Sequence, residues 1–320
     1  MKKVTIEDIS RHTGLSRGTV SRALNDRPDI SSRTKQRVVE ACRELHYVPS
    51  HAARTLATGR TLNACVFVDD LGSQLAIDVL RGVLLAAADH HYTVGIVELG
   101  ARPDVAAERF AQVGLDRIDC AILCAARADH LALQASALAA EHPLATTTPI
   151  PGLACDHFAP DEREAGRVAA RLALRHGGAC AFLDADGANP ERWQGFAEVL
   201  AENGRDVGDA YFRLEGDPGG ARVKIRAAQV VVGSSPVASA RAAAWSAEDG
   251  RSVGSDVRLI AFGGCDGLAS AGYVHSVVDP AGEELGRRAF ETLLQRAAKQ
   301  RTDGPTQVLI APRVIEVPAA

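Results

Sequence analysis

Aromatic residues are scarce in this chain, and long apolar runs are missing altogether. Phe, Trp and Tyr make up 4% of the 320 residues, which argues against an aromatic-lined sugar site or an RNA-stacking surface. No apolar run approaches the ~20 residues that a membrane helix needs, so no membrane partner is expected. The first five residues lead into polar sequence without the apolar core of a secretory signal. We therefore expect a cytoplasmic protein.

Enzyme signatures are missing as well. The sequence contains no Gly-x-Gly-x-x-Gly, no phosphate-binding loop ending in Gly-Lys-Ser/Thr, no His-Glu-x-x-His and no Gly-x-Ser-x-Gly. Residues 263–267 are glycine-rich and follow an apolar run, but they lack the spacing of a nucleotide-binding fingerprint. We therefore expect no enzymatic activity, no cofactor and no metal ion.

A disulfide framework is also not expected. The seven cysteines are odd in number and scattered, unlike the paired pattern of a secreted domain. Cys120 and Cys124 lie on one expected strand, where four residues span ~13 Å, too far for a disulfide or a shared metal ion. Reduced thiols that pack in the interior are the simpler interpretation.

The formal net charge of −4 conceals an uneven distribution. Residues 1–60 carry twelve basic and six acidic residues, a net charge of +6, whereas residues 61–320 carry 24 basic and 34 acidic residues, a net charge of −10. A basic head on an acidic body suggests that the head meets a polyanion. A solvated basic face would show the same charge, so charge alone decides little.

The basic head has the pattern of a helix-turn-helix. Residues 5–8 have the Ser/Thr-x-x-Asp/Glu form of a capping box that begins a helix. Gly14 supplies a turn, Ser16 is placed to cap a second helix over residues 17–24, and Ser31 or Ser32 caps a third. Two short helices joined by a Gly-containing turn form a unit whose second helix enters the DNA major groove. The apolar positions expected to face inward on the third helix are Val38, Val39, Cys42 and Leu45.

The second of these helices carries side chains suited to DNA. Arg17 can donate to both O6 and N7 of guanine, and Gly18 leaves room for close approach. Thr19, Ser21 and Arg22 share the exposed face and suit phosphates and base edges. A small three-helix bundle with a solvated basic helix would show the same spacing, so that alternative stays open.

A short segment separates the basic head from the body. Pro49 stops the third helix, Ser50 can cap a new one, and Gly59 ends it. About two turns of helix are too few to be stable alone in water. The segment is therefore either a plain linker or a helix that orders on binding.

Three runs of residues in this head carry a family resemblance. They are Val4-Thr5-Ile6-x-Asp8-Ile9, Gly14-Leu15-Ser16-x-x-Thr19-Val20-Ser21-Arg22-x-Leu24-Asn25 and Tyr47-x-Pro49-Ser50-x-Ala52-Ala53-Arg54-x-Leu56. They resemble the lactose-repressor (LacI/GalR) family of bacterial transcription regulators. The resemblance implies that Arg17, Gly18 and Arg22 read the major groove and that residues 50–58 form a hinge helix on specific DNA. It also implies that Leu56 and its dimer mate insert into the minor groove and bend the operator. The residues expected to contact DNA are Thr5, Ser16, Arg17, Gly18, Thr19, Ser21, Arg22, Asn25, Ser31, Tyr47, Ser50, Ala53 and Leu56.

In the acidic body, short apolar runs alternate with helical stretches. Such alternation predicts parallel sheets with crossover helices. About 260 residues exceed one comfortable core, so two α/β lobes are expected, with a ligand beyond the carboxyl ends of the strands. Strands are expected over 64–68, 93–97, 120–124, 144–147, 180–183, 229–232, 259–262 and 308–310, and helices over 74–90, 105–113, 130–141, 162–175, 192–203, 237–247 and 283–299.

The resemblance extends into this body, which is similar to the family's periplasmic-binding-protein-like effector domain. Residues 118–123, 192–196 and 257–262 match its strand motifs and its Arg-x-x-Gly-Phe/Tyr motif. The implied fold class is α/β, with an N-terminal helix-turn-helix headpiece and a two-lobed domain of parallel sheets. The expected domains are 1–49 for the helix-turn-helix, 50–61 for the hinge helix and linker, and 62–320 for effector binding and dimerisation. Within the last, the N-lobe is expected over about 62–157 plus 277–300 and the C-lobe over about 162–274 plus 305–318.

The expected ligand pocket departs from the family pattern. Ser234-Ser235 stands where the family has an Asn-Asp pair, and Gly263-Gly264 stands where it has an acidic pair. Arg192 remains and favours an anionic or carbonyl-bearing ligand, although an ion pair on the surface would explain it equally well. The candidate effector contacts are Arg192, Ser234, Asp156 and Asp279. The last three are equally well explained as cap or turn residues.

The sequence thus predicts a sequence-specific transcription regulator that acts as a repressor. Two-fold symmetry predicts a homodimer on a pseudopalindromic operator of double-stranded DNA. Its small-molecule effector is expected to be an anionic or phosphorylated metabolite, or to be absent, because neutral sugars would find too few hydrogen-bonding partners. The alternative is a cytoplasmic small-molecule-binding protein or enzyme of the two-lobed α/β class.

Overall fold

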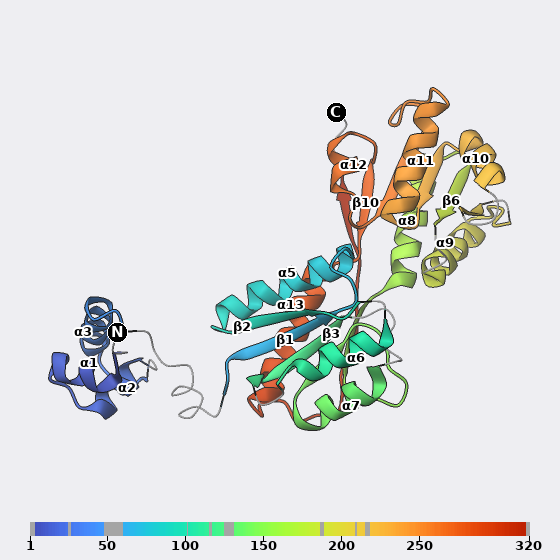
Figure 1. The fold of residues 1–320 in the computed structure, drawn as a ribbon. Coiled ribbons are helices and arrows are strands. Elements are labelled where there is room, and N and C mark those ends of the chain that lie inside the picture. The colour runs from blue at the N-terminus through green and yellow to red at the C-terminus, as the bar shows by residue number, and fades with distance from the viewer. Residues whose placement is uncertain are drawn as a thin grey trace. The chain divides into compact units, whose positions relative to one another are not determined.

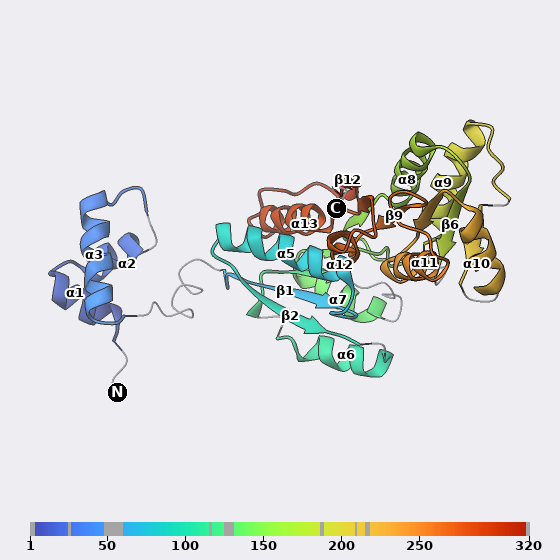
Figure 2. The same cartoon turned by 90° about the horizontal axis from the view of Figure 1, so that it is seen from above.

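The chain divides into two compact units, Met1–Thr61 and Leu62–Ala320. The computed structural model describes residues 4–24, 27–47, 60–100, 102–114, 117–124, 131–185, 189–208, 210–214 and 218–317 (Figures 1 and 2). Within these residues, no helix is both long and apolar enough to span a bilayer.

In the described residues of the first unit, three helices form a bundle. They are α1 (Ile6–Thr13), α2 (Arg17–Leu24) and α3 (Ser32–Glu44). At the start of α1, the backbone N–H of Thr5 donates to the Asp8 carboxylate at 2.9 Å, as in a capping box. Gly14 ends this helix with a φ of 68°, a conformation that glycine adopts without strain. Ser16 accepts from the N–H of Thr19 at 3.1 Å and caps α2, which confirms the predicted capping residues and turn.

A small apolar core holds the three helices together. Its buried members are Ile9, Val20, Ala23, Val38, Ala41 and Tyr47. Val38 faces inward as predicted, but Val39 is 42% exposed. Neighbouring residues on a helix point in directions about 100° apart. The expectation that both face the core is therefore wrong for Val39.

The second unit contains two six-stranded sheets with the orders β11-β5-β4-β3-β1-β2 and β12-β10-β9-β8-β6-β7. The first sheet consists of β1 (Asn63–Val68), β2 (Thr93–Glu98), β3 (Cys120–Cys124), β4 (Leu144–Thr146), β5 (Asp156–Pro160) and β11 (Gln307–Ile310). The second consists of β6 (Cys180–Asp184), β7 (Tyr211–Arg213), β8 (Val230–Gly233), β9 (Arg258–Phe262), β10 (Ser276–Asp279) and β12 (Arg313–Glu316). These strands pair in parallel except for β10 with β12.

Helices cover both faces of each sheet, as Figure 1 shows for the first. The first sheet lies between α5 (Gln74–Asp89) with α13 (Gly282–Ala297) and α6 (Pro103–Gln112) with α7 (Ala132–Glu141). The second lies between α8 (Glu162–His176) with α9 (Pro190–Glu202) and α10 (Pro218–Ala227) with α11 (Pro236–Glu248) and α12 (Asp266–Ser270). We call the first sheet and its helices the N-lobe, and the second sheet and its helices the C-lobe.

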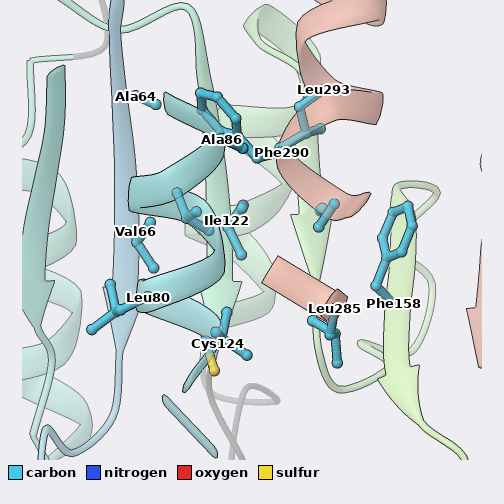
Figure 3. Close-up of a cluster of buried hydrophobic side chains, with 14 of the residues drawn as sticks. Ala64, Val66, Leu80, Ala86, Ile122, Cys124, Phe158, Leu285, Phe290 and Leu293 are labelled. Atoms are coloured by element: carbon cyan, nitrogen blue, oxygen red, sulfur yellow. The ribbon is translucent and has the colours of Figure 1, made fainter. Parts of the chain in front are cut away.

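The side chains of β1 alternate between the two helix layers, as strand geometry requires. Ala64 and Val66 pack with α5 and α13 (Figure 3), and Val68 belongs to the same cluster. Cys65 and Phe67 pack with α6 and α7. Because both faces are covered, the strand is apolar at successive positions. This is why a continuous apolar run marks β1 in the sequence.

The cysteines are free thiols. Burial raises the pKa of Cys65 to about 12 and that of Cys124 to about 11, so both stay protonated at neutral pH. A protonated thiol is a poor nucleophile and a poor metal ligand. The interpretation of these cysteines as packing residues is therefore supported.

Strand pairing corrects the expected lobe boundaries. β10 pairs with β9, so residues 277–279 belong to the C-lobe and not to the N-lobe. β11 pairs with β5, so residues 307–310 belong to the N-lobe, although we expected them in the C-lobe. The chain therefore crosses between the lobes after β5, after β10 and after β11. Neither boundary is visible in the sequence, because the pairing partner of a strand is set by tertiary structure.

Each lobe contains one pair of helices that approach closely through glycine. In the N-lobe, a Cβ atom on Gly82 of α5 would overlap the backbone carbonyl of Glu283, and one on Gly286 of α13 would overlap that of Val79. In the C-lobe, a Cβ atom on Gly166 of α8 would overlap the backbone of α9. These backbones cannot move apart without disturbing the cores of both helices.

We expect Gly82→Ala to destabilise the protein by about 1–3 kcal/mol, because the new methyl group overpacks a backbone contact. Denaturant unfolding of the variant measures the change. Gly267→Ala is the matched control, because its new Cβ meets no atom within 4 Å. Equal stability of the two variants would contradict the proposed close contact.

Candidate nucleic-acid interface and ligand site

The α2 helix presents a polar and basic face opposite its buried side. Val20 is buried in the core of the first unit, whereas Arg17, Gly18 and Arg22 are exposed. Residues three or four apart lie on the same side of a helix, so Arg17 lies next to Ser21, and Gly18 next to Ser21 and Arg22. The half-buried Ser21 lies between them along this face. The structure thus brings together the side chains expected to meet base edges.

Arg22 is held along the helix by two acceptors. Its Nε donates to the Gly18 carbonyl oxygen at 3.3 Å, and its Nη1 lies 3.2 Å from a carboxylate oxygen of Asp29. Both side chains of this ion pair are more than half exposed. Such pairs contribute about 0–1 kcal/mol, so DNA can compete for the guanidinium. Asp29 is not predicted from the sequence, because nothing in the sequence indicates which side chain Arg22 contacts.

The other residues expected at DNA have structural partners or lie outside the described residues. The Thr19 and Ser16 hydroxyls are 2.9 Å apart, and Ser31 caps α3 by accepting from the N–H of Thr34 at 3.3 Å. Thr5 is exposed at the start of α1. Tyr47 is 9% exposed and belongs to the core of the first unit. Asn25, Ser50, Ala53 and Leu56 lie outside the described residues.

Arg192 lies near the start of α9, at the carboxyl edge of the C-lobe sheet. Its Nε and Nη2 form a forked ion pair with Glu162, the first residue of α8, with Nη2 2.9 Å from Oε1. Its Nη1 donates to the carbonyl oxygen of Ser234 at 2.6 Å, and its guanidinium carbon lies 4.7 Å from the centre of the Phe262 ring. The ion pair weighed as an alternative is thus present, but it is largely buried.

Ser234 joins this arginine to a second carboxylate. The Ser234 hydroxyl donates to Asp184 at 2.9 Å, and the Tyr211 hydroxyl donates to the other oxygen of Asp184 at 2.7 Å. Burial, together with the hydrogen bond to Asp184, raises the pKa of Tyr211 to about 12. Neither Glu162 nor Asp184 is among the effector contacts predicted from the sequence. Asp184 could have been predicted as a candidate, because it directly follows the strand expected over 180–183.

Asp279 and Asp156 lie at opposite ends of their strands. Asp279 ends β10 at the carboxyl edge, where it accepts from the N–H of Ala281 at 2.9 Å in a turn. Asp156 begins β5 and accepts from Arg296 at 2.5 and 2.7 Å and from the N–H of Thr306 at 2.7 Å. Placing Asp156 in one pocket with Arg192 is therefore wrong, because Asp156 lies at the amino end of its strand and has a structural ion pair. It lines a separate pocket of about 320 Å³ together with His142, Cys155 and Arg296.

Comparison with known proteins agrees with these two units. Residues 5–50 match the family described as bacterial regulatory proteins, lacI family. Residues 170–316 match the periplasmic binding protein-like domain. The chain belongs to the LacI family. The first match covers α1, α2 and α3. The second covers most of the C-lobe, together with α13 and β11 of the N-lobe.

Curated relatives align with about a quarter of this LacI-family chain. The regulator RegA of Clostridium saccharobutylicum is 38% identical over 78 residues, which are 24% of each chain. The regulator MalR of Streptococcus pneumoniae is 36% identical over 98 residues, which are 29% of this chain and 30% of MalR. The chain thus spans about a quarter to a third of the length of these relatives.

Solved structures show the fold of the whole chain. The lac repressor dimer bound to operator and the anti-inducer ONPF covers 100% of both chains, with a TM-score of 0.74 and 17% identity. The CelR–cellobiose complex covers 99% of this chain and 100% of that one, with a TM-score of 0.65 and 20% identity. The fold is therefore a helix-turn-helix unit followed by two parallel-sheet α/β lobes.

We expect Asp156→Ala to lower the free energy of unfolding by about 3–5 kcal/mol, because it leaves Arg296 buried without its partner. Denaturant unfolding measures this change. Asp303→Ala is the control, because Asp303 lies 3.6 Å from the same arginine but is 57% exposed, which predicts a loss of no more than about 1 kcal/mol. Equal losses in the two variants would contradict a structural role that is specific to Asp156.

Proposed function

We propose that this LacI-family chain is a sequence-specific DNA-binding transcription regulator that acts as a repressor. The observation that carries the proposal is the exposed face of α2, where Arg17, Gly18 and Arg22 stand together on a helix-turn-helix. A guanidinium can donate to two acceptors of guanine in the major groove. The net charge of +6 in residues 1–60 supplies the electrostatic attraction to the phosphates. Operator binding, measured with duplex DNA, tests the proposal.

We propose further that the chain binds a pseudopalindromic operator as a homodimer. The exposed side of α5 carries Ile77, Leu84 and Leu85. Ile96 is exposed on β2, which is the edge strand of the same sheet. Apolar side chains gathered on one exposed surface are typical of protein interfaces. The lac repressor structure of similar fold is a dimer bound to operator, which supports this arrangement.

A small-molecule effector is proposed to control DNA binding from the carboxyl edge of the C-lobe sheet. In α/β sheets, ligands bind at that edge, and the related CelR structure is a complex with cellobiose. The sequence predicts an anionic or phosphorylated effector, or none. The anionic alternative depends on Arg192, and the structure pairs Arg192 with Glu162.

The alternative function, a cytoplasmic small-molecule-binding protein or enzyme, leaves the first unit without a role. Such a protein needs the two lobes but no basic three-helix bundle. A cytoplasmic location remains part of the proposal, since a regulator must reach DNA. Binding of duplex DNA by the purified chain separates the two functions.

We expect Arg22→Ala to weaken binding to the operator by about 1–3 kcal/mol, because it removes a base-edge donor. It should weaken binding to random duplex DNA much less. Fluorescence anisotropy with both duplexes measures the two affinities. Arg11→Ala is the matched control, because Arg11 is 75% exposed but lies on α1. Equal losses on operator and random DNA in Arg22→Ala would show that Arg22 contacts phosphate alone.

We expect Leu85→Asp to shift the chain from dimer to monomer, because a buried carboxylate replaces an apolar contact. The dimer dissociation constant should rise tenfold or more, which corresponds to at least about 1.4 kcal/mol. Sedimentation at several concentrations measures it. Leu133→Asp on α7 is the control, since Leu133 is 80% exposed and lies outside the proposed interface. An unchanged dimer in Leu85→Asp would exclude this face as the interface.

A further inference from the structure

The polar groups at the carboxyl edge of the C-lobe sheet form one connected chain of hydrogen bonds. Asp184 accepts from the Ser234 hydroxyl. The carbonyl oxygen of Ser234 accepts from Arg192, which is paired with Glu162. This chain holds two carboxylates and one guanidinium, so its formal charge is negative. Arg213 is aligned with Asp184 in the β6–β7 pairing, but its side chain is exposed and water screens its charge.

Glu162 occupies the side of the guanidinium that an anionic ligand would use. Its two oxygens accept from Nε and Nη2 of Arg192, in the forked geometry by which arginine binds carboxylates and phosphates. Asn189 donates to the same carboxylate at 3.4 Å. The Arg192 and Glu162 side chains are 12% and 13% exposed. An arriving anion would leave Glu162 largely buried without a cation, which is energetically costly.

Arg192 nevertheless keeps donors for a ligand. A guanidinium has five N–H groups, and three of those of Arg192 donate to protein oxygens among the described residues. Two N–H groups therefore have no acceptor within the part of the chain that the structure describes. Because the positive charge is already compensated, these donors favour a neutral acceptor over a charged one.

We propose that Glu162 determines the ligand specificity of this site. It neutralises Arg192, so the site binds an uncharged compound with an acceptor oxygen, such as a carbonyl group, and rejects phosphate and carboxylate ligands. The inference rests on the proposed effector site. It selects the carbonyl-bearing ligand over the anionic one, between which the sequence could not decide.

The test adds inorganic phosphate to the full chain at constant ionic strength, with chloride as the balancing ion. Glu162→Gln keeps an acceptor oxygen for Arg192 but removes the negative charge. A ligand that binds only the folded state raises the Tm. We expect phosphate to give a saturable rise in Tm for Glu162→Gln, with an affinity at least tenfold tighter than in the unmodified chain. Replacing Arg192 by Gln in the Glu162→Gln background should abolish the gain.

Glu164→Gln is the matched control. Glu164 lies on the same helix and pairs with Arg171 instead of Arg192, so the variant makes the same charge change elsewhere. A gain in Glu164→Gln equal to that in Glu162→Gln would overturn the proposal. Equal phosphate binding by the unmodified chain and Glu162→Gln would also overturn it, as would no binding by either.

Two further measurements keep the result interpretable. Glu162→Ser, which also removes the charge at this position, replaces Glu162→Gln if that variant does not fold, and the same outcomes apply. Operator binding by the unmodified chain is measured separately. A chain that shows the expected phosphate pattern but no operator binding would overturn the proposed function and leave the specificity of this site intact.

Discussion

Three crossovers between two parallel sheets determine where this chain can bind a small molecule. β5, β10 and β11 each lead to a crossover from their carboxyl ends. β5 is parallel to β4 and β11, and β10 is parallel to β9, so the carboxyl ends of these strands lie on the same edge of each sheet. The polar groups that follow β6 and β8, and those that begin α8 and α9, are thereby gathered at one edge. Within each lobe, a close contact through glycine joins two of the helices that cover the sheet.

Two largely buried arginine–carboxylate ion pairs have different roles because they lie at opposite edges of their sheets. Arg296 and Asp156 lie at the amino end of β5, where further hydrogen bonds tie the chain before β11 to the strand. Arg192 and Glu162 lie at the carboxyl edge, where ligands bind in folds of this type. A buried pair adds little net stability but is costly to break. The first pair therefore fixes the fold, and the second sets the charge of the proposed site.

Periodicity in the sequence predicts many of the helices and strands, but not which strands or charged side chains pair with each other. Strands covered on both faces, such as β1 and β3, are continuous apolar runs. For long amphipathic helices such as α5 and α13, the predicted ends lie within two residues of the observed ones. β12 has four exposed residues, and β7 has three residues in all, so neither gives an apolar signal. The sequence identifies Arg192 as a candidate, but the carboxylate that neutralises it lies 30 residues away. No local pattern indicates that contact.

Selection of bound sequences from a random duplex library by the full chain tests the central claim most directly. The helix-turn-helix unit and a two-fold dimer predict one enriched motif made of two inverted half-sites. The centre of each half-site should carry the guanine contacts expected from arginine on α2. Recovery of no enriched motif, or of a single half-site without its inverted partner, would contradict the account.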